Sequence, residues 1–362
     1  MKKVVGFVFT CLGIVLAFAA ATPVHAQNYH SFVSGNGTGT ACTFSAPCAL
    51  LDTAVSATIS GGLVSCVDQG ANSEGSSSFG LAILTKSLTI DCAGTSAGVY
   101  SVIINGPGIV VTLRNLNING LTLQGSYGVD FLNGSALFVE HCVIENWTVP
   151  GAAIGIRFAP PNGVTAELHV TDSVIKNNGN GTSGGGIIIQ PSGSGAVHAV
   201  IERTTVENNT YGIFANNTGG TGSILLHIKD STVANSTVNG ISAYTAGSTT
   251  AIVIDHSSSL INGGSGILSQ GSGGLVFLTD TTVMSHGTEG LRDSASVVSP
   301  IGFTTGTTAR SPSPRRSPST VALATWETSL VPVPTASRSA PPLQPPSFSA
   351  ILPWTVLPAT VS

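Results

Sequence analysis

Charged and proton-transferring side chains recur at one position of a segment that repeats along this chain of 362 residues. In order, the position holds His141, Asp172, Arg203, Asp230, His256 and Asp280. If the repeats stack as layers of strands, neighbours in this column lie about 4.8 Å apart, close to the roughly 5–10 Å that separates the carboxylates of a two-carboxylate hydrolase. If the chain has an active site, we expect it in the column from Asp172 to Asp280.

The alternating signs of these charges favour a structural role. The same alternation is present in two neighbouring columns, which are Glu202, Lys229, Asp255 and Glu145, Lys176, Glu207. Opposite charges in adjacent layers form exposed ion-pair ladders, in which each pair contributes about 0–1 kcal/mol. We therefore predict ladders that fix the register of the layers, and no catalytic residues.

The remaining reactive side chains do not predict a metal site or a cofactor. His169 and His227 share a column but are two layers apart, roughly 9–10 Å, whereas the ligands of a tetrahedral zinc ion lie about 2 Å from the metal. Cys142 stands where other repeats have serine or threonine, so a packed free thiol is expected there. Tyr211 and Tyr244 flank a repeated Gly-aliphatic pair, and weak contact with a sugar is the binding that they allow.

The repeated segment has a period of about 26 residues and reads as apolar strand, polar corner, small residue, apolar residue and asparagine. Its copies are VEHCVIEN (139–146), VTDSVIKN (170–177), IERTTVEN (201–208), IKDSTVAN (228–235), LTDTTVMS (278–285), the longer IDHSSSLIN (254–262) and the looser LRNLNING (113–120). Apolar runs this short, rich in β-branched residues and interrupted by glycine, indicate strands rather than helices. A single repeat buries nothing, but a stack of repeats buries a continuous core.

Alignment of the copies defines five columns. The first apolar column is Val139, Val170, Ile201, Ile228, Ile254 and Leu278. The second is Ile144, Ile175, Val206, Val233, Leu260 and Val283, and the small residues between the two are Cys142, Ser173, Thr204, Ser231, Ser257 and Thr281. An asparagine ladder is expected at the next corner, where asparagine tolerates left-handed geometry, from Asn146, Asn177, Asn208, Asn235 and Asn262. A Gly-aliphatic pair follows each time, from Gly128-Val129 through Gly155-Ile156, Gly186-Ile187, Gly212-Ile213, Gly240-Ile241 and Gly266-Ile267 to Gly290-Leu291.

These columns predict an all-β fold, a single-stranded right-handed parallel β-helix solenoid. We expect a signal peptide at 1–26, an N-terminal cap region at 27–62, coils at 63–306 and a tail at 307–362. Loops are expected between the asparagine corner and the Gly-aliphatic strand, for example at 179–185. The tail has 11 of the 19 prolines and no glycine, asparagine or aspartate, so it is interpreted as a disordered extension or as the product of a shifted reading frame.

The N-terminal residues predict export. Lys2 and Lys3 precede an apolar run, and Val24-His25-Ala26 resembles a cleavage site, so a mature chain beginning near Gln27 is expected to be secreted, outside the cytoplasm. Export permits disulfides. The candidate cysteines are Cys42 with Cys48, which close a short loop, and Cys66 with Cys92, one repeat length apart.

Composition narrows the class of partner. Without the expected signal peptide and tail, the chain has 7 basic and 16 acidic residues, a formal charge of −9. An acidic body gives no electrostatic reason to bind nucleic acid, and no later run has the roughly 18 apolar residues of a membrane span. A polysaccharide or cell-envelope glycan is the expected partner, and the sequence does not give the oligomeric state.

Residues 30–300 resemble the right-handed parallel β-helix, or pectin-lyase-like, superfamily, and are most similar to uncharacterised secreted bacterial members. The resemblance is carried by Cys42, Cys48, Cys66, TIDC (89–92), VTLRNLNING (111–120) and VEHCVIEN (139–146). It implies the fold but not one activity, because the superfamily includes lyases, hydrolases, epimerases, adhesins and members without known activity.

One short motif resembles that of an enzyme family. Ile254-Asp255-His256 is similar to a pectate lyase segment, but it occupies the ordinary corner position of the repeat. The arginines Arg114, Arg157, Arg203 and Arg292 lie outside any lyase motif. We therefore expect a non-catalytic surface or glycan-binding scaffold, and the alternative is a divergent polysaccharide lyase, hydrolase or epimerase.

Overall fold

The computed structural model describes residues 27–69, 79–95, 97–120, 125–151, 153–293, 296–298 and 304–306. The expected signal peptide at 1–26 and the expected tail at 307–362 lie outside the described residues. Within the described residues, no helix is both long enough and apolar enough to cross a membrane.

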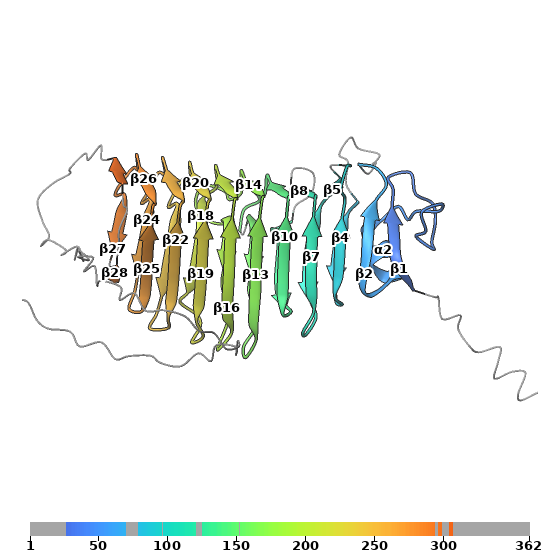
Figure 1. The fold of residues 1–362 in the computed structure, drawn as a ribbon, viewed down its shortest axis with the longest axis horizontal. Helices are drawn as coiled ribbons and strands as arrows, with labels where there is room; N and C mark the ends of the chain where they lie inside the picture. Colours follow the sequence, from blue (N-terminus) through green and yellow to red (C-terminus); the bar gives the residue numbers. More distant parts are fainter. Residues whose placement is uncertain are drawn as a thin grey trace, which may run out of the picture. The chain divides into compact units, whose positions relative to one another are not determined.

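The fold is all-β and consists of three stacks of parallel strands (Figure 1). Sheet 1 contains, in spatial order, β1 (Asn28–Val33), β2 (Thr58–Cys66), β4 (Leu88–Asp91), β7 (Val110–Arg114), β10 (Ala136–Glu140), β13 (Thr165–Thr171), β16 (Ala196–Glu202), β19 (Ile224–Lys229), β22 (Thr250–Asp255), β25 (Gly274–Thr279) and β28 (Ser296–Val298). Sheet 2 contains β5 (Gly98–Val99), β8 (Asn117–Asn119), β11 (Val143–Glu145), β14 (Val174–Lys176), β17 (Thr205–Glu207), β20 (Thr232–Ala234), β23 (Ser258–Leu260), β26 (Thr282–Met284) and β29 (Thr304–Gly306).

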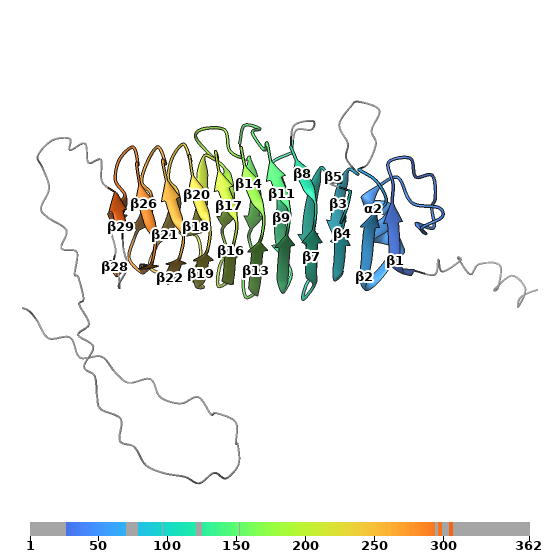
Figure 2. The same ribbon diagram turned by 45° about the horizontal axis from the view of Figure 1, so that its top comes forward.

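Sheet 3 contains β3 (Leu81–Leu84), β6 (Ser101–Asn105), β9 (Tyr127–Asn133), β12 (Ile154–Phe158), β15 (Gly185–Ile189), β18 (Tyr211–Asn217), β21 (Ile241–Thr245), β24 (Ile267–Gln270) and β27 (Leu291–Asp293). From β7 onward the chain visits sheets 1, 2 and 3 in turn before it returns to sheet 1. Each such circuit is one coil. Figure 2 shows the strands of each sheet as a row along the stack.

The first apolar column forms the inward row of sheet 1, as predicted. Val139 pairs with Val170, Val170 with Ile201, and Ile201 with Ile228. All four side chains are fully buried. The spacing of about 26 residues is therefore the length of one coil.

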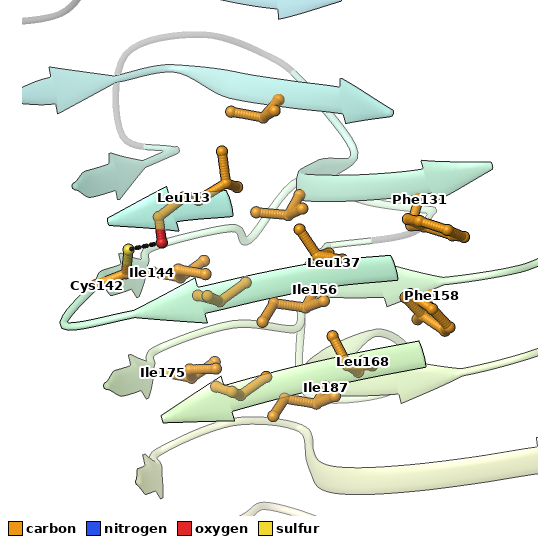
Figure 3. Packing of buried hydrophobic residues seen from close by; sticks show 14 of the residues in the cluster. Leu113, Phe131, Leu137, Cys142, Ile144, Ile156, Phe158, Leu168, Ile175 and Ile187 are labelled. Atoms are coloured by element: carbon orange, nitrogen blue, oxygen red, sulfur yellow. Dashed lines mark hydrogen bonds between the residues drawn. The ribbon is translucent and has the colours of Figure 1, made fainter. Parts of the chain in front are cut away.

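The core lies between the three sheets, and each coil contributes side chains from all of them (Figure 3). In one coil, Leu137 from sheet 1, Ile144 from sheet 2 and Ile156 from sheet 3 are fully buried. Phe131 and Phe158 of sheet 3 stack with ring centroids 4.2 Å apart. Burial of each aliphatic side chain contributes about 1.5–3 kcal/mol.

The prediction that Leu260 belongs to the second apolar column is wrong. Ser259 pairs with Val233 on one side and with Val283 on the other, so it occupies the inward position. The strand ladder keeps its register through this segment and does not absorb the extra residue. Ser259 is tolerated in the core because its hydroxyl donates to the Gly266 carbonyl oxygen at 2.9 Å and accepts from the Asn262 amide at 3.1 Å.

The same register corrects the predicted asparagine ladder. Asn146, Asn177, Asn208 and Asn235 have φ between 54° and 65°, but the next residue in this left-handed corner is Ile261, with φ 53°. Asn262 follows it and lies in another column. The corner is also a poor ladder, because Asn208 and Asn235 are exposed.

A buried polar column lies one residue after the corner. It contains Trp147, Asn178, Asn209, Ser236 and Asn262. The backbone N–H of Asn178 donates to Asn209 Oδ1 at 2.9 Å, and Asn209 Nδ2 donates to the Ile175 carbonyl oxygen at 3.0 Å. The backbone N–H of Ser236 donates to Asn262 Oδ1 at 2.9 Å. These amides therefore satisfy backbone groups that bend away from the sheets.

The N-terminal part carries the one α-helix among the described residues, α2 (Leu51–Ala57), together with β1 and β2. Cys42 and Cys48 form a disulfide, with Cα atoms 4.7 Å apart. A second disulfide joins Cys66, the last residue of β2, to Cys92, directly after β4, also with 4.7 Å between Cα atoms. It therefore links two neighbouring layers of sheet 1.

Candidate functional site

The outer face of sheet 3 gathers aromatic side chains and one arginine. Because inward and outward residues alternate along each strand, Asp130, Arg157 and Phe214 point outward while their neighbours fill the core. Tyr127, Tyr211 and Tyr244 are half-buried on the same sheet. We call the surface formed by Tyr127, Arg157, Tyr211, Phe214 and Tyr244 the aromatic face.

A glycine column positions these strands. Gly212 directly precedes the inward Ile213, and a Cβ atom built on Gly212 would lie 2.5 Å from the carbonyl oxygen of Gly240 in the next coil. Gly155 and Gly186 show the same crowding against the next coil. Glycine is required because neighbouring backbones approach closely, and this explains the recurring Gly-aliphatic pair.

Arg157 and Asp130 form the most ordered polar contact of the aromatic face. Arg157 Nε donates to Asp130 Oδ1 at 2.7 Å, and Nη2 donates to Oδ2 at 2.8 Å. The guanidinium also lies over the Tyr127 ring, 4.0 Å from its centroid. Burial opposes the charge of Arg157, but the hydrogen bonds and the charge of Asp130 outweigh burial and raise the pKa of Arg157. Nη1 does not take part in the bidentate contact and is the donor available to a ligand.

An aromatic cluster lies further along the face. The rings of Tyr211 and Phe214 stack with centroids 5.1 Å apart. Phe214 meets Tyr244 of the next coil edge-on at 4.7 Å. Burial raises the pKa of Tyr244, so its phenol is uncharged at neutral pH. Neutral aromatic rings with polar tips suit the alternating apolar and hydroxyl surfaces of a sugar.

The expected loop at 179–185 precedes β15 and lies at the edge of sheet 3 where Tyr211 begins β18. Asn180 Oδ1 accepts hydrogen bonds from the backbone N–H groups of Thr182 and Ser183, at 3.1 and 2.8 Å. The backbone N–H of Gly181 donates to Thr210 Oγ1 in the next coil. This loop is therefore held in place beside the aromatic face.

The charged column found in the sequence lies elsewhere, at the corner between sheets 1 and 2. All six of its residues have φ between 43° and 52°. Arg203 makes a bidentate contact with Asp172, at 2.8 and 2.9 Å, and a further contact with Glu202 at 2.5 Å. The hydrogen bond from Arg203 lowers the pKa of Asp172, which holds the carboxylate ionised and makes it a poor proton donor.

The neighbouring columns also pair opposite charges. Lys176 Nζ lies 3.5 Å from Glu145 Oε2, and Lys229 Nζ lies 3.9 Å from Glu202 Oε1. His256 Nδ1 is 2.8 Å from Asp255 Oδ1, and its Nε2 is 3.3 Å from Asp280 Oδ2. The segment that resembles a pectate lyase motif is thus part of the ion-pair ladder.

The remaining residues singled out in the sequence do not converge on a metal or a nucleophile. His169 and His227 both lie opposite Val200, on either side of it, and are therefore two layers apart. Among the described residues, no group of three or more histidine, cysteine or acidic side chains could hold a metal ion. Cys142 is buried, its Sγ donates to the carbonyl oxygen of Leu113 at 3.5 Å (Figure 3), and burial raises its pKa to about 12.

The Asp130–Arg157 pair was missed in the sequence although a signal for it exists. Both residues directly follow a Gly-aliphatic pair, and they are 27 residues apart. Extending the columns by one position beyond the aliphatic residue would have placed them side by side. Trp147 was expected to cover the core edge, and it is fully buried.

Comparisons with protein-family models, with curated proteins and with solved structures find no match.

Proposed function

We propose that this chain is a secreted, non-catalytic scaffold that binds a polysaccharide or cell-envelope glycan on the aromatic face. The observation that carries the proposal is the alignment of Tyr211, Phe214 and Tyr244 on adjacent coils, with ring centroids 5.1 and 4.7 Å apart. A linear glycan lying along the stack would meet these rings in succession. Arg157 would add a donor for hydroxyl or carboxylate groups.

The arrangement of acidic groups favours binding over cleavage. On the outward side of β9 to β24, Asp130 is the one carboxylate among the described side chains, and both of its oxygens accept from Arg157. A two-carboxylate mechanism needs a second acidic group about 5–10 Å away. The acidic side chains of the corner column are engaged in ion pairs.

The test is binding to a panel of neutral and acidic polysaccharides by affinity electrophoresis and calorimetry. Tyr211→Ala and Tyr244→Ala should each weaken binding about five- to tenfold, because each removes one stacking surface. Tyr29→Ala is the matched control, since Tyr29 is 69% exposed and lies on β1. Equal binding by all the variants would contradict the proposal.

The enzymatic alternative is tested in the same samples, with and without calcium. Unsaturated products or new reducing ends that disappear in Asp230→Ala would favour a divergent polysaccharide lyase, hydrolase or epimerase. Binding without turnover supports the scaffold.

We also infer export, a right-handed sense of coiling and kinship with the pectin-lyase-like superfamily. Two disulfides support export, since such bonds persist in oxidising compartments. Parallel strands joined by crossovers are almost always right-handed, which supports the sense of coiling. N-terminal sequencing of the exported protein should begin near Gln27, and an experimental structure would test the handedness and the kinship.

A further inference from the structure

The outer face of sheet 1 carries an apolar groove of about 580 Å³, distinct from the aromatic face. Its lining includes His169, His198, Leu225, His227 and Val253. Leu225 is 45% exposed and Val253 is 37% exposed. Large apolar side chains are therefore open to solvent at the centre of this face.

The strand register arranges the face into straight rows. The middle row reads Phe138, His169, Val200, His227, Val253 and Phe277. The row nearest the corner reads Glu140, Thr171, Glu202, Lys229, Asp255 and Thr279. An uncharged band is thus bordered by a band of mixed charge, as an interface core is bordered by its polar rim.

We propose that a second copy of this chain docks on this face, with the twofold axis parallel to the strands and between β16 and β19. A twofold interface brings the same surface of both copies together. This axis reverses the order of the coils, so Val200 faces the partner copy's His227 and Phe138 faces its Phe277. In the charged row, Glu202 faces Lys229 of the other copy, and the symmetry forms that pair twice.

Charge complementarity selects this axis over its neighbours. An axis on β16 would place Glu202 against its own copy, and an axis on β19 would do the same for Lys229. Like charges juxtaposed across an interface are unfavourable. The chosen axis also passes through the centre of the groove, whose lining comes from β13, β16, β19 and β22.

The available area is sufficient for a specific dimer. Seven strands from β7 to β25, spaced about 4.8 Å apart and each about 20 Å long, present roughly 700 Å². A standard interface buries about 800 Å² on each partner. The face is therefore of the size that a stable dimer needs.

Sedimentation velocity of the full chain at about 1 to 100 µM tests the proposal. A dimer is expected, and Val200→Lys should raise its Kd at least about 100-fold, because the twofold axis brings two lysines into the apolar centre. Val174→Lys is the matched control: Val174 is an outward, half-buried valine of sheet 2, and its substitution should leave the Kd unchanged. Circular dichroism would establish that both variants are folded.

Charge exchange tests the axis itself. Glu202→Lys and Lys229→Glu should each raise the Kd about tenfold, because each disrupts both cross-copy pairs. The double variant should return to the wild-type Kd, since it restores opposite charges across the axis. A chain that is monomeric at every concentration, or a double variant as weak as the single ones, would overturn the proposal.

Discussion

Replacement of Asn209 by alanine is the most direct test of the buried polar column. Asn209 is fully buried, and its side chain makes three hydrogen bonds, two accepted from Asn178 and one donated to the Ile175 carbonyl oxygen. Loss of three bonds at a net 0.5–1.5 kcal/mol each, together with a stranded buried N–H, gives a loss of about 3–5 kcal/mol in the free energy of unfolding.

Asn208→Ala is the control, because Asn208 is the adjacent residue that the repeat pattern assigned to the ladder. Its side chain is exposed, and its φ of 56° makes alanine unfavourable there by roughly 1–2 kcal/mol. Urea unfolding followed by far-ultraviolet circular dichroism would measure both losses, and hydrogen exchange at the Asn178 amide would localise the first. If Asn208→Ala were the more damaging substitution, the placement of the ladder inside the coil would be refuted.

Four further perturbations follow from the fold. Ile201→Ala should destabilise the protein by about 2–5 kcal/mol in urea unfolding, because it leaves a cavity in the fully buried row of sheet 1. Gly212→Ala should cost about 1–3 kcal/mol by the same measurement, because the new Cβ would meet the backbone of the next coil. Cys142, whose pKa burial raises to about 12, should not react with a thiol reagent at about pH 8 until the chain unfolds. Arg203 lowers the pKa of Asp172, so their contact stabilises the fold above about pH 4 and is lost as the pH falls through the folded-state pKa; Arg203→Gln should therefore flatten the acid side of the stability profile.

The sequence was sufficient for the coils because their inward rows are chemically uniform. Val170, Ile201 and Ile228 are aliphatic, evenly spaced and followed by a polar corner, so one alignment placed all three in adjacent layers. The alignment failed at 254–262, where it favoured the apolar Leu260 over Ser259. Strand register is fixed by the backbone ladder, and a hydroxyl that finds partners can occupy a core position.

The candidate site was only partly predictable. Tyr211 and Tyr244 were named from their proximity to the Gly-aliphatic strands, but the bidentate Asp130–Arg157 contact depends on two side chains one coil apart. The groove on sheet 1 was missed for another reason. Alternating strands expose every second residue, and the apolar outward residues Leu225 and Val253 could not be distinguished from inward ones without the register.

The bond between Cys66 and Cys92 gives the stack a mechanical polarity. In a linear array each layer is held only by its neighbours, so a chain pulled at its two ends would peel from the carboxyl end, one circuit at a time. Peeling would stop at the covalent rung between β2 and β4. Under tension the last resisting layers are therefore the ones next to the amino terminus, and a reductant would release the length of chain between the two sulfur atoms.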